Sequence, residues 1–181
     1  MDSEDEGELY IGCAGGTNAN ASFSYEGTPV PAGMTAYKLT VKGLKGGHSG
    51  LDIPLGRGNS NKILNRLMWV SERNYGLRLA SIDGGSLRNA IPRESFSIVV
   101  VPEQKKDEFL KYVKEFTTDA KKELSAVEPD LTILVDPVPA PDALVDEKTQ
   151  RNLFNAIYAC PNGVIRMSNE MQGLVETSTN L

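Results

Sequence analysis

The chain has 181 residues, of which 40% are hydrophobic and 24% are charged. These fractions are typical of a globular protein with one sizeable core and exclude an intrinsically disordered chain. A formal net charge of −5 repels phosphate backbones and anionic lipid surfaces, so neither nucleic acid nor a membrane is expected as a partner.

The cysteines and the apolar runs place the protein in a reducing compartment. Cys13 and Cys160 lie far apart and have no Cys or His neighbours at metal-ligand spacing, so neither a zinc knuckle nor a disulfide framework is expected. No apolar run approaches the roughly 18 residues that span a bilayer, and the N-terminus lacks a signal-peptide pattern. The sequence therefore predicts a cytoplasmic protein with reduced thiols.

The N-terminal part of the chain predicts extended structure. Short strands are expected at 9–12 and 21–25, separated by turn residues. Between 36 and 44, apolar and polar residues alternate with a period of two, as in a strand with one buried face. The apolar positions of this strand are Tyr37, Leu39 and Val41.

The rest of the chain alternates between helical and extended patterns. Asn59 or Ser60 can cap a helix that ends near Gly76, because apolar residues recur at spacings of three and four. A second helix starts at Pro102 and runs to about residue 124, with its lysines mostly facing water. The remaining expected elements are strands beginning near Leu77, at 95–100 and at 131–135, a helix over 147–160 and an extended run over 175–181.

The order strand, helix, strand, strand, helix, strand predicts an α+β fold. It matches the ferredoxin-like βαββαβ two-layer sandwich, with an antiparallel sheet and both helices on one face. The N-terminal strands and the helix over 147–160 are additions to this plan. Neither sheet edge is evidently protected by a proline or a bulge, so pairing with a second copy, and hence a homodimer, is expected.

The only histidine, His48, lies in the glycine-rich stretch Lys45–Gly50. The flanking glycines let the backbone approach a ligand closely and leave the imidazole accessible. One interpretation is an ordinary surface residue in a turn. The other is a hydrogen-bond donor to a developing oxyanion or to a substrate carboxylate, because no nucleophile motif or second histidine accompanies it.

Two other sets of polar residues have both a functional and a simpler interpretation. The acidic start, from Asp2 to Glu8, offers ligands for a hard cation or zinc, and a solvated terminal acidic run is the simpler alternative. Asn89, between the second and third strands, either satisfies backbone groups of a turn or presents its amide to a peptide carbonyl or carboxylate.

Five stretches, in this order, resemble the bacterial aminoacyl-histidine dipeptidases. They are DSEDEGE at 2–8, GCAGG at 12–16, KGLKGGHSG at 42–50, LRNAIPRE at 87–94 and PNGVIR at 161–166. These enzymes belong to the co-catalytic zinc exopeptidases, which also include carnosinases and other cytosolic dipeptidases. The abrupt acidic start and the interrupted strand at the C-terminus likewise favour a segment of a longer protein.

The resemblance implies a parent enzyme for Xaa-His type dipeptides, with a two-zinc catalytic domain and an inserted lid that often mediates dimerisation. In such an enzyme a zinc-bound water, deprotonated by a Glu, attacks the peptide carbonyl. The resemblance further implies that residues 1–15 are a stub of the catalytic domain, 16–160 the lid and dimerisation domain, and 161–181 the segment that returns to the catalytic domain. Alone, the chain is expected to be inactive and to bind no zinc.

The same resemblance assigns roles to three residues. Asp2 matches a zinc ligand. His48 matches the lid histidine that reaches an active site, in dimeric relatives that of the partner subunit, where it polarises the scissile carbonyl or holds the substrate. Asn89 matches a lid asparagine that contacts the dipeptide. The other zinc ligands, the general base and a carboxylate-binding Arg are expected outside this chain.

Two alternative functions remain. A self-standing ferredoxin-like module for dimerisation or for small-ligand binding would leave His48 structurally idle. A nucleic-acid-binding version of the fold needs aromatic residues on the open sheet face and a basic surface. Lys38, Thr40 and Lys42 include no aromatic residue, and the net charge is acidic, so this version is disfavoured.

Overall fold

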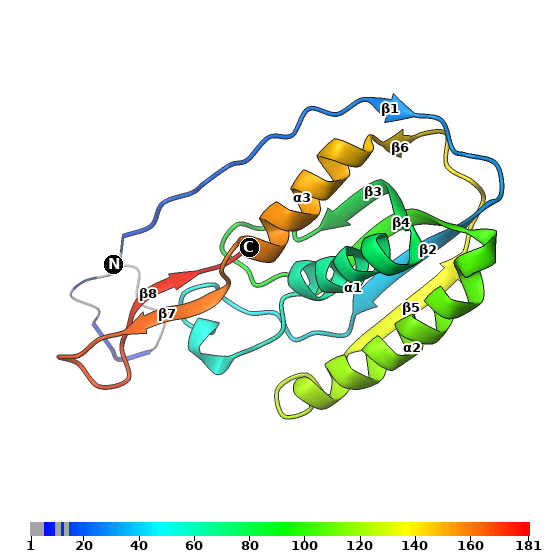
Figure 1. Cartoon of the computed structure of the whole chain (residues 1–181). Coiled ribbons are helices and arrows are strands. Elements are labelled where there is room, and N and C mark those ends of the chain that lie inside the picture. The colour runs from blue at the N-terminus through cyan, green and yellow to red at the C-terminus, as the bar shows by residue number, and fades with distance from the viewer. Residues whose placement is uncertain (1–5, 10–11, 13–14) are drawn as a thin grey trace.

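The computed structural model describes residues 6–9, 12 and 15–181 (Figure 1). Its main feature is a four-stranded antiparallel sheet with the strand order β3-β4-β2-β5. Helices α1 and α2 connect β2 to β3 and β4 to β5. This connectivity is that of the ferredoxin-like fold, so the predicted α+β sandwich is confirmed. The strands are β2 (Met34–Lys42), β3 (Arg78–Gly84), β4 (Ser95–Pro102) and β5 (Thr132–Pro137), and the helices are α1 (Ser60–Tyr75) and α2 (Lys106–Glu123).

Strand β2 lies in the middle of the sheet and supplies the centre of the core. Its residues Tyr37, Leu39 and Val41 are buried together with apolar residues of both helices, as their alternation predicted. Tyr37 pairs with Val99 of β4, and Leu39 pairs with Val135 of β5. The central strand therefore fixes the register of its neighbours on both sides.

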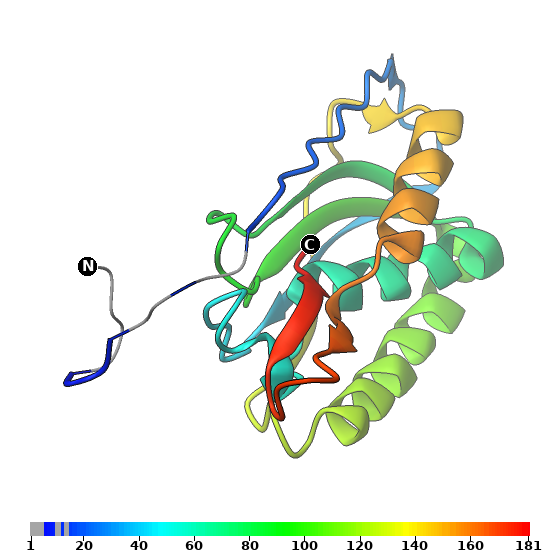
Figure 2. The ribbon, with the colours of Figure 1, turned by 90° about the vertical axis from the view of Figure 1, so that its left-hand side faces the viewer.

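The helices cover one face of the sheet (Figure 2). Helix α1 begins after Asn59, whose side chain accepts a hydrogen bond of 3.2 Å from the Lys62 N–H, and it ends at Gly76 with φ of 68°. Helix α2 starts later than predicted, because the 3-10 turn η2 (Glu103–Lys105) follows Pro102. No helix in the described part of the chain is long and apolar enough to cross a membrane.

A third helix and two short strands extend the sandwich. Helix α3 (Glu147–Ala159) packs beside α1 and buries Phe154 completely. Strand β6 (Leu144–Val145) precedes it and pairs with β1 (Gly27–Thr28). The ribbon is extended by hydrogen bonds from Glu26 N to Asp146 Oδ2 (3.2 Å) and from Asp146 N to Glu26 O (3.1 Å).

The expectation that neither sheet edge is protected is wrong. On the β3 edge, the side chain of Gln150 accepts a hydrogen bond from Leu79 N (2.7 Å) and donates one to Leu77 O (3.1 Å). The strand also has an irregular register between Leu79 and Ser81. At the opposite edge, β5 ends in Pro137. Both devices limit pairing with a further strand.

The extended run expected at 21–25 forms no strand, and its residues are exposed. It lies along α3, where Thr149 Oγ1 donates a hydrogen bond of 3.5 Å to Ser24 O, and it has no ladder partner. For the predicted strand at 9–12, residues 10–11 are outside the described part, and Leu9 and Gly12 are not in a strand. The extended run over 175–181 does contain a strand, β8 (Val175–Thr179), which pairs with β7 (Gly163–Met167).

The open face of the sheet is apolar at β4. Phe96 and Ile98 lie on this face, while Ser95 and Ser97 are buried beneath the helices. Ser95 Oγ donates to the Ser60 carbonyl at 2.9 Å, which satisfies its hydroxyl inside the core. Lys38 Nζ lies 5.0 Å from the centroid of the Phe96 ring. The open face thus carries an aromatic residue, on β4 rather than on β2.

Candidate functional site

The connection between β2 and α1 holds His48 in a compact loop that requires glycine. Gly46 and Gly47 have φ of 65° and 135°, in the region that L-residues avoid. A Cβ on Gly47 would also overlap the side chains of Arg57 and Asp52. The 3-10 turn η1 (Ile53–Leu55) shapes the second half of the loop. The glycines therefore permit a close crossing of the two loop arms.

The imidazole of His48 has a defined orientation and tautomer. Its Nδ1 accepts hydrogen bonds from the backbone N–H groups of Gly50 and Leu51, each at 3.1 Å. Because an accepting ring nitrogen carries no proton, the neutral ring has its proton on Nε2. The His48 side chain is exposed, so Nε2–H can donate a hydrogen bond to a ligand. The same two bonds cap the turn at Gly50 and Leu51, so they fit a structural role as well as a binding role.

The loop between β3 and β4 brings Asn89 beside the histidine loop. Ser49 N donates to Asn89 O at 2.9 Å, and Ile91 N donates to Gly47 O at 2.8 Å, which forms an isolated bridge between His48 and Ala90. Asn89 is itself exposed. The two candidate residues from distant parts of the sequence are therefore neighbours at one end of the sheet.

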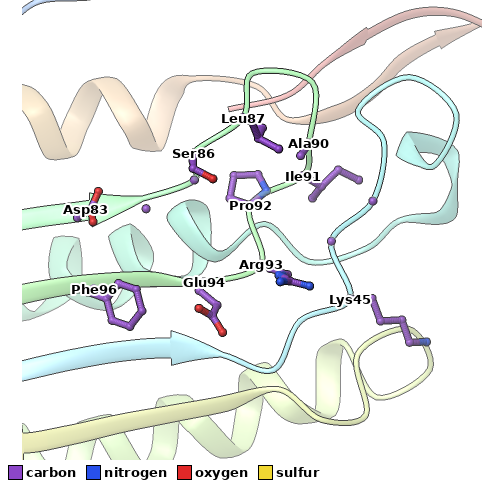
Figure 3. A pocket seen from close by; sticks show the side chains of 14 residues that line it. Lys45, Asp83, Ser86, Leu87, Ala90, Ile91, Pro92, Arg93, Glu94 and Phe96 are labelled. Atoms are coloured by element: carbon purple, nitrogen blue, oxygen red, sulfur yellow. The ribbon is translucent and has the colours of Figure 1, made fainter.

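A cavity of about 510 Å³ lies against these two loops (Figure 3). Its apolar wall includes Leu87, Ile91 and Phe96, and charged residues of both signs stand around it. The sequence analysis assigned no role to these charged residues, although three of them lie in the stretches 42–50 and 87–94. The charged residues are Lys45, Asp83, Arg93 and Glu94.

The C-terminal segment also contacts the site loops. Asn180 Nδ2 donates to Ala90 O at 2.9 Å. Asn59 Nδ2 donates to Asn162 Oδ1 at 2.8 Å and to Leu181 O at 2.9 Å. The α1 N-terminus, the Asn89 loop and the β7–β8 hairpin are thus tied together.

Lys62 fixes the point where α3 leads into this segment. Its ammonium donates to Ile157 O (2.6 Å), Tyr158 O (2.9 Å) and Cys160 O (2.6 Å), which are carbonyls left free at a helix end. Burial lowers the pKa of Lys62 from its ordinary value, and the neighbouring Cys160 opposes this shift. The side chain joins α1 to the start of the C-terminal segment.

The described residues do not fit a zinc site. Within 6–9, 12 and 15–181, no group of three or more His, Cys, Asp or Glu side chains could hold one metal ion. The predicted ligand Asp2 lies outside the described residues. The structure therefore gives no step that passes through a metal.

The fold defines a small α+β domain with two adjoining polar loops at one end of its sheet. Residues 33–128 match the family described as peptidase dimerisation domain, and the chain belongs to that family. The chain is 43% identical over 180 residues to the cytosol non-specific dipeptidase of Escherichia coli strain K12, covering 99% of this chain and 37% of that protein.

A solved structure extends this likeness. The crystal structure of the aminoacylhistidine dipeptidase from Vibrio alginolyticus is 42% identical, with a TM-score of 0.85, over 87% of this chain and 32% of that chain. The present chain therefore spans about a third of the length of both proteins. The resemblance drawn from the five sequence motifs leads to the same group of proteins.

Proposed function

We propose that this chain is the lid and dimerisation segment of a longer cytoplasmic, zinc-dependent dipeptidase that hydrolyses Xaa-His type dipeptides. Membership of the peptidase dimerisation domain family and the likeness to two proteins named as dipeptidases support this proposal. In it, residues 1–15 and 161–181 connect to the catalytic part, and 16–160 form the lid. Asp2 serves as one zinc ligand, with the other ligands elsewhere in the longer protein.

The observation that carries the proposal is the orientation of His48. Its Nδ1 is occupied by two backbone N–H groups, so Nε2–H is left to donate to the carbonyl oxygen of a peptide. A donor held in place before the reaction stabilises the oxyanion without further reorganisation. Asn89, on the adjoining loop, supplies an amide that binds the carboxylate or the peptide group of the same dipeptide.

The proposal also includes a homodimer, because family members are described as dimerisation domains. The site lies at one end of the sheet on two exposed loops, where a second protein surface can close over it. Closure of such a lid excludes water and brings the donor to the reacting carbonyl. Catalysis would then depend on residues from both parts of the longer protein.

The test is a graft of this chain in place of the matching segment of the Escherichia coli dipeptidase. We expect the graft to hydrolyse dipeptides with added zinc and His48→Ala to lower kcat by about 10²- to 10³-fold, as for loss of one oxyanion donor. Lys111→Ala is the matched control, since Lys111 lies on α2 with its side chain 80% exposed. The isolated chain is expected to be inactive.

Other outcomes separate the alternatives. A folded but inactive graft, with the isolated chain binding dipeptides or other small molecules, favours the self-standing ligand-binding module. Hydrolysis by the isolated chain contradicts the claim that its site is incomplete. An unchanged kcat in the His48→Ala graft contradicts the role of His48.

A further inference from the structure

Glu128 is a buried carboxylate that the proposed chemistry does not use. Its residue is only 1% exposed, and it lies in the connection between α2 and β5. Oε2 accepts a hydrogen bond from Lys45 N at 2.8 Å, and Oε1 accepts one from Gly58 N at 2.9 Å. These two N–H groups stand at the two ends of the loop that carries His48. One carboxylate therefore holds the two ends of that loop together, and we call the pair of ends at Lys45 and Gly58 the neck of the loop.

The bonds of Glu128 continue through the loop to His48. Arg57, next to Gly58, donates to Gly46 O at 2.6 Å, and its guanidinium lies 3.5 Å from the Asp52 carboxylate. Asp52 Oδ2 in turn accepts from His48 N at 2.8 Å. The Arg57–Gly46 and Asp52–His48 bonds join the two arms of the loop, and the Arg57–Asp52 ion pair links them within the second arm. The position of the His48 backbone thus depends on the neck that Glu128 holds.

An ionised glutamate suits this position better than its neutral isostere. A carboxylate offers only acceptor oxygens, and both face backbone N–H donors. A glutamine would turn an NH2 group toward one of these N–H groups and leave a buried donor without a partner. The fit is also close, because a Cβ on Gly58 would lie 3.4 Å from Glu128 Cγ and 3.0 Å from Leu44 Cδ2.

We propose that Glu128 is a positioning residue, which holds the loop so that the His48 ring keeps its Nδ1 on the Gly50 and Leu51 amides and its Nε2–H toward the substrate. The proposal rests on the function proposed above for His48. It predicts an effect on one imidazole ring beyond any general effect on stability. Glu128 itself touches no substrate.

The chain contains a single histidine, so 15N labelling of histidine reports this ring alone. NMR of the full chain should show the two 15N signals of one ring, with the chemical shift of an unprotonated Nδ1 and that of a protonated Nε2. In Glu128→Gln and Glu128→Ala we expect the tautomer mixture of free histidine and faster hydrogen exchange at Gly50 and Leu51. Far-UV circular dichroism should show the same helix and strand content as in the unmutated chain.

Gln150→Ala is the matched control. Gln150 is also 1% exposed and also bonds two backbone groups, but these belong to Leu77 and Leu79 at the other edge of the sheet. It should lower stability while leaving the His48 ring signal unchanged. An unchanged ring signal in Glu128→Gln, or an equal change in Gln150→Ala, overturns the proposal.

Activity in the graft separates this inference from the function on which it rests. We expect Glu128→Gln to lower kcat by up to about 10²-fold, the loss from a misplaced catalytic group, and to add nothing when His48 is already Ala. If His48→Ala leaves kcat unchanged while Glu128→Gln still releases the ring, the proposed function fails and the positioning role stands. If His48→Ala lowers kcat and Glu128→Gln does not, the positioning role fails.

Discussion

Gly43, the first residue after β2, allows a direct test of how tightly the site loop is held to the sandwich. Its φ is 81°, and a Cβ there would overlap the carbonyl oxygen of Asp130 and lie 3.0 Å from the Asp130 carbonyl carbon. Because both groups belong to the backbone, neither can rotate away. Gly43→Ala therefore has to displace the connection between α2 and β5, the same connection that carries Glu128.

The expected loss of stability has two parts. An L-residue in the left-handed region costs about 1–2 kcal/mol, partly offset by about 0.4–1 kcal/mol from the lower entropy of the unfolded chain. Overpacking against backbone adds about 1–3 kcal/mol. Gly33→Ala isolates the first part, because Gly33 has φ of 76° and its Cβ would meet nothing within 4 Å. We expect a loss of up to about 1.6 kcal/mol for Gly33→Ala and a further loss of about 1–3 kcal/mol for Gly43→Ala.

Urea unfolding followed by tryptophan fluorescence measures both variants. The chain has one tryptophan, Trp69, which stacks on Tyr158 with ring centroids 4.6 Å apart and has the Arg73 guanidinium 3.6 Å from its ring centroid. Its emission should therefore change when α1 and α3 separate. Equal losses of unfolding free energy for Gly43→Ala and Gly33→Ala would refute the argument that close backbone contact holds the loop.

Two further predictions concern partly buried titratable side chains, Tyr112 and Lys62. Burial raises the pKa of Tyr112 from 10.0 to about 12, so above pH 10 the unfolded chain loses this proton before the folded protein does, and the free energy of unfolding should fall as pH rises from 10 to 12. Tyr112→Phe should flatten that decline in urea titrations, and an unchanged decline contradicts the assignment. Lys62→Met should lower the free energy of unfolding by about 2 kcal/mol, because the carbonyls at the end of α3 lose a charged donor. The control is Lys148→Met, at an exposed position of α3. Equal losses of unfolding free energy in the two variants would exclude the capping role of Lys62.

The sandwich could be predicted because its signals are local. The alternation of Tyr37, Leu39 and Val41 indicates a strand with one buried face, and Asn59 and Gly76 mark the ends of α1 through capping chemistry alone. The run at 21–25 has the same local character but finds no partner strand. A strand forms only where a second strand lies beside it and pairs with it by hydrogen bonds. The local sequence of a segment does not show whether such a partner is present.

Tertiary contacts decide the features that could not be predicted. Ser95 of β4 faces the core, where its hydroxyl donates to the Ser60 carbonyl at the start of α1, whereas Phe96 faces outward beside Lys38. Ser97 also faces the core, and its hydroxyl has no hydrogen-bond partner among the described residues. The glycines around the only histidine pointed to the site loop. The residue that holds this loop, Glu128, bonds to Lys45, which lies 83 positions away in the sequence. No local pattern marks such a residue.

The short β1–β6 ribbon has a consequence for the order in which the chain folds. Its two rungs join Gly27 to Val145 and Thr28 to Leu144, and the second pair is separated by 116 positions in the sequence. The entropy lost in closing so long a loop is recovered only after the intervening sandwich has compacted. We therefore expect the ribbon to form after the sandwich, so that β1 reaches its native place late.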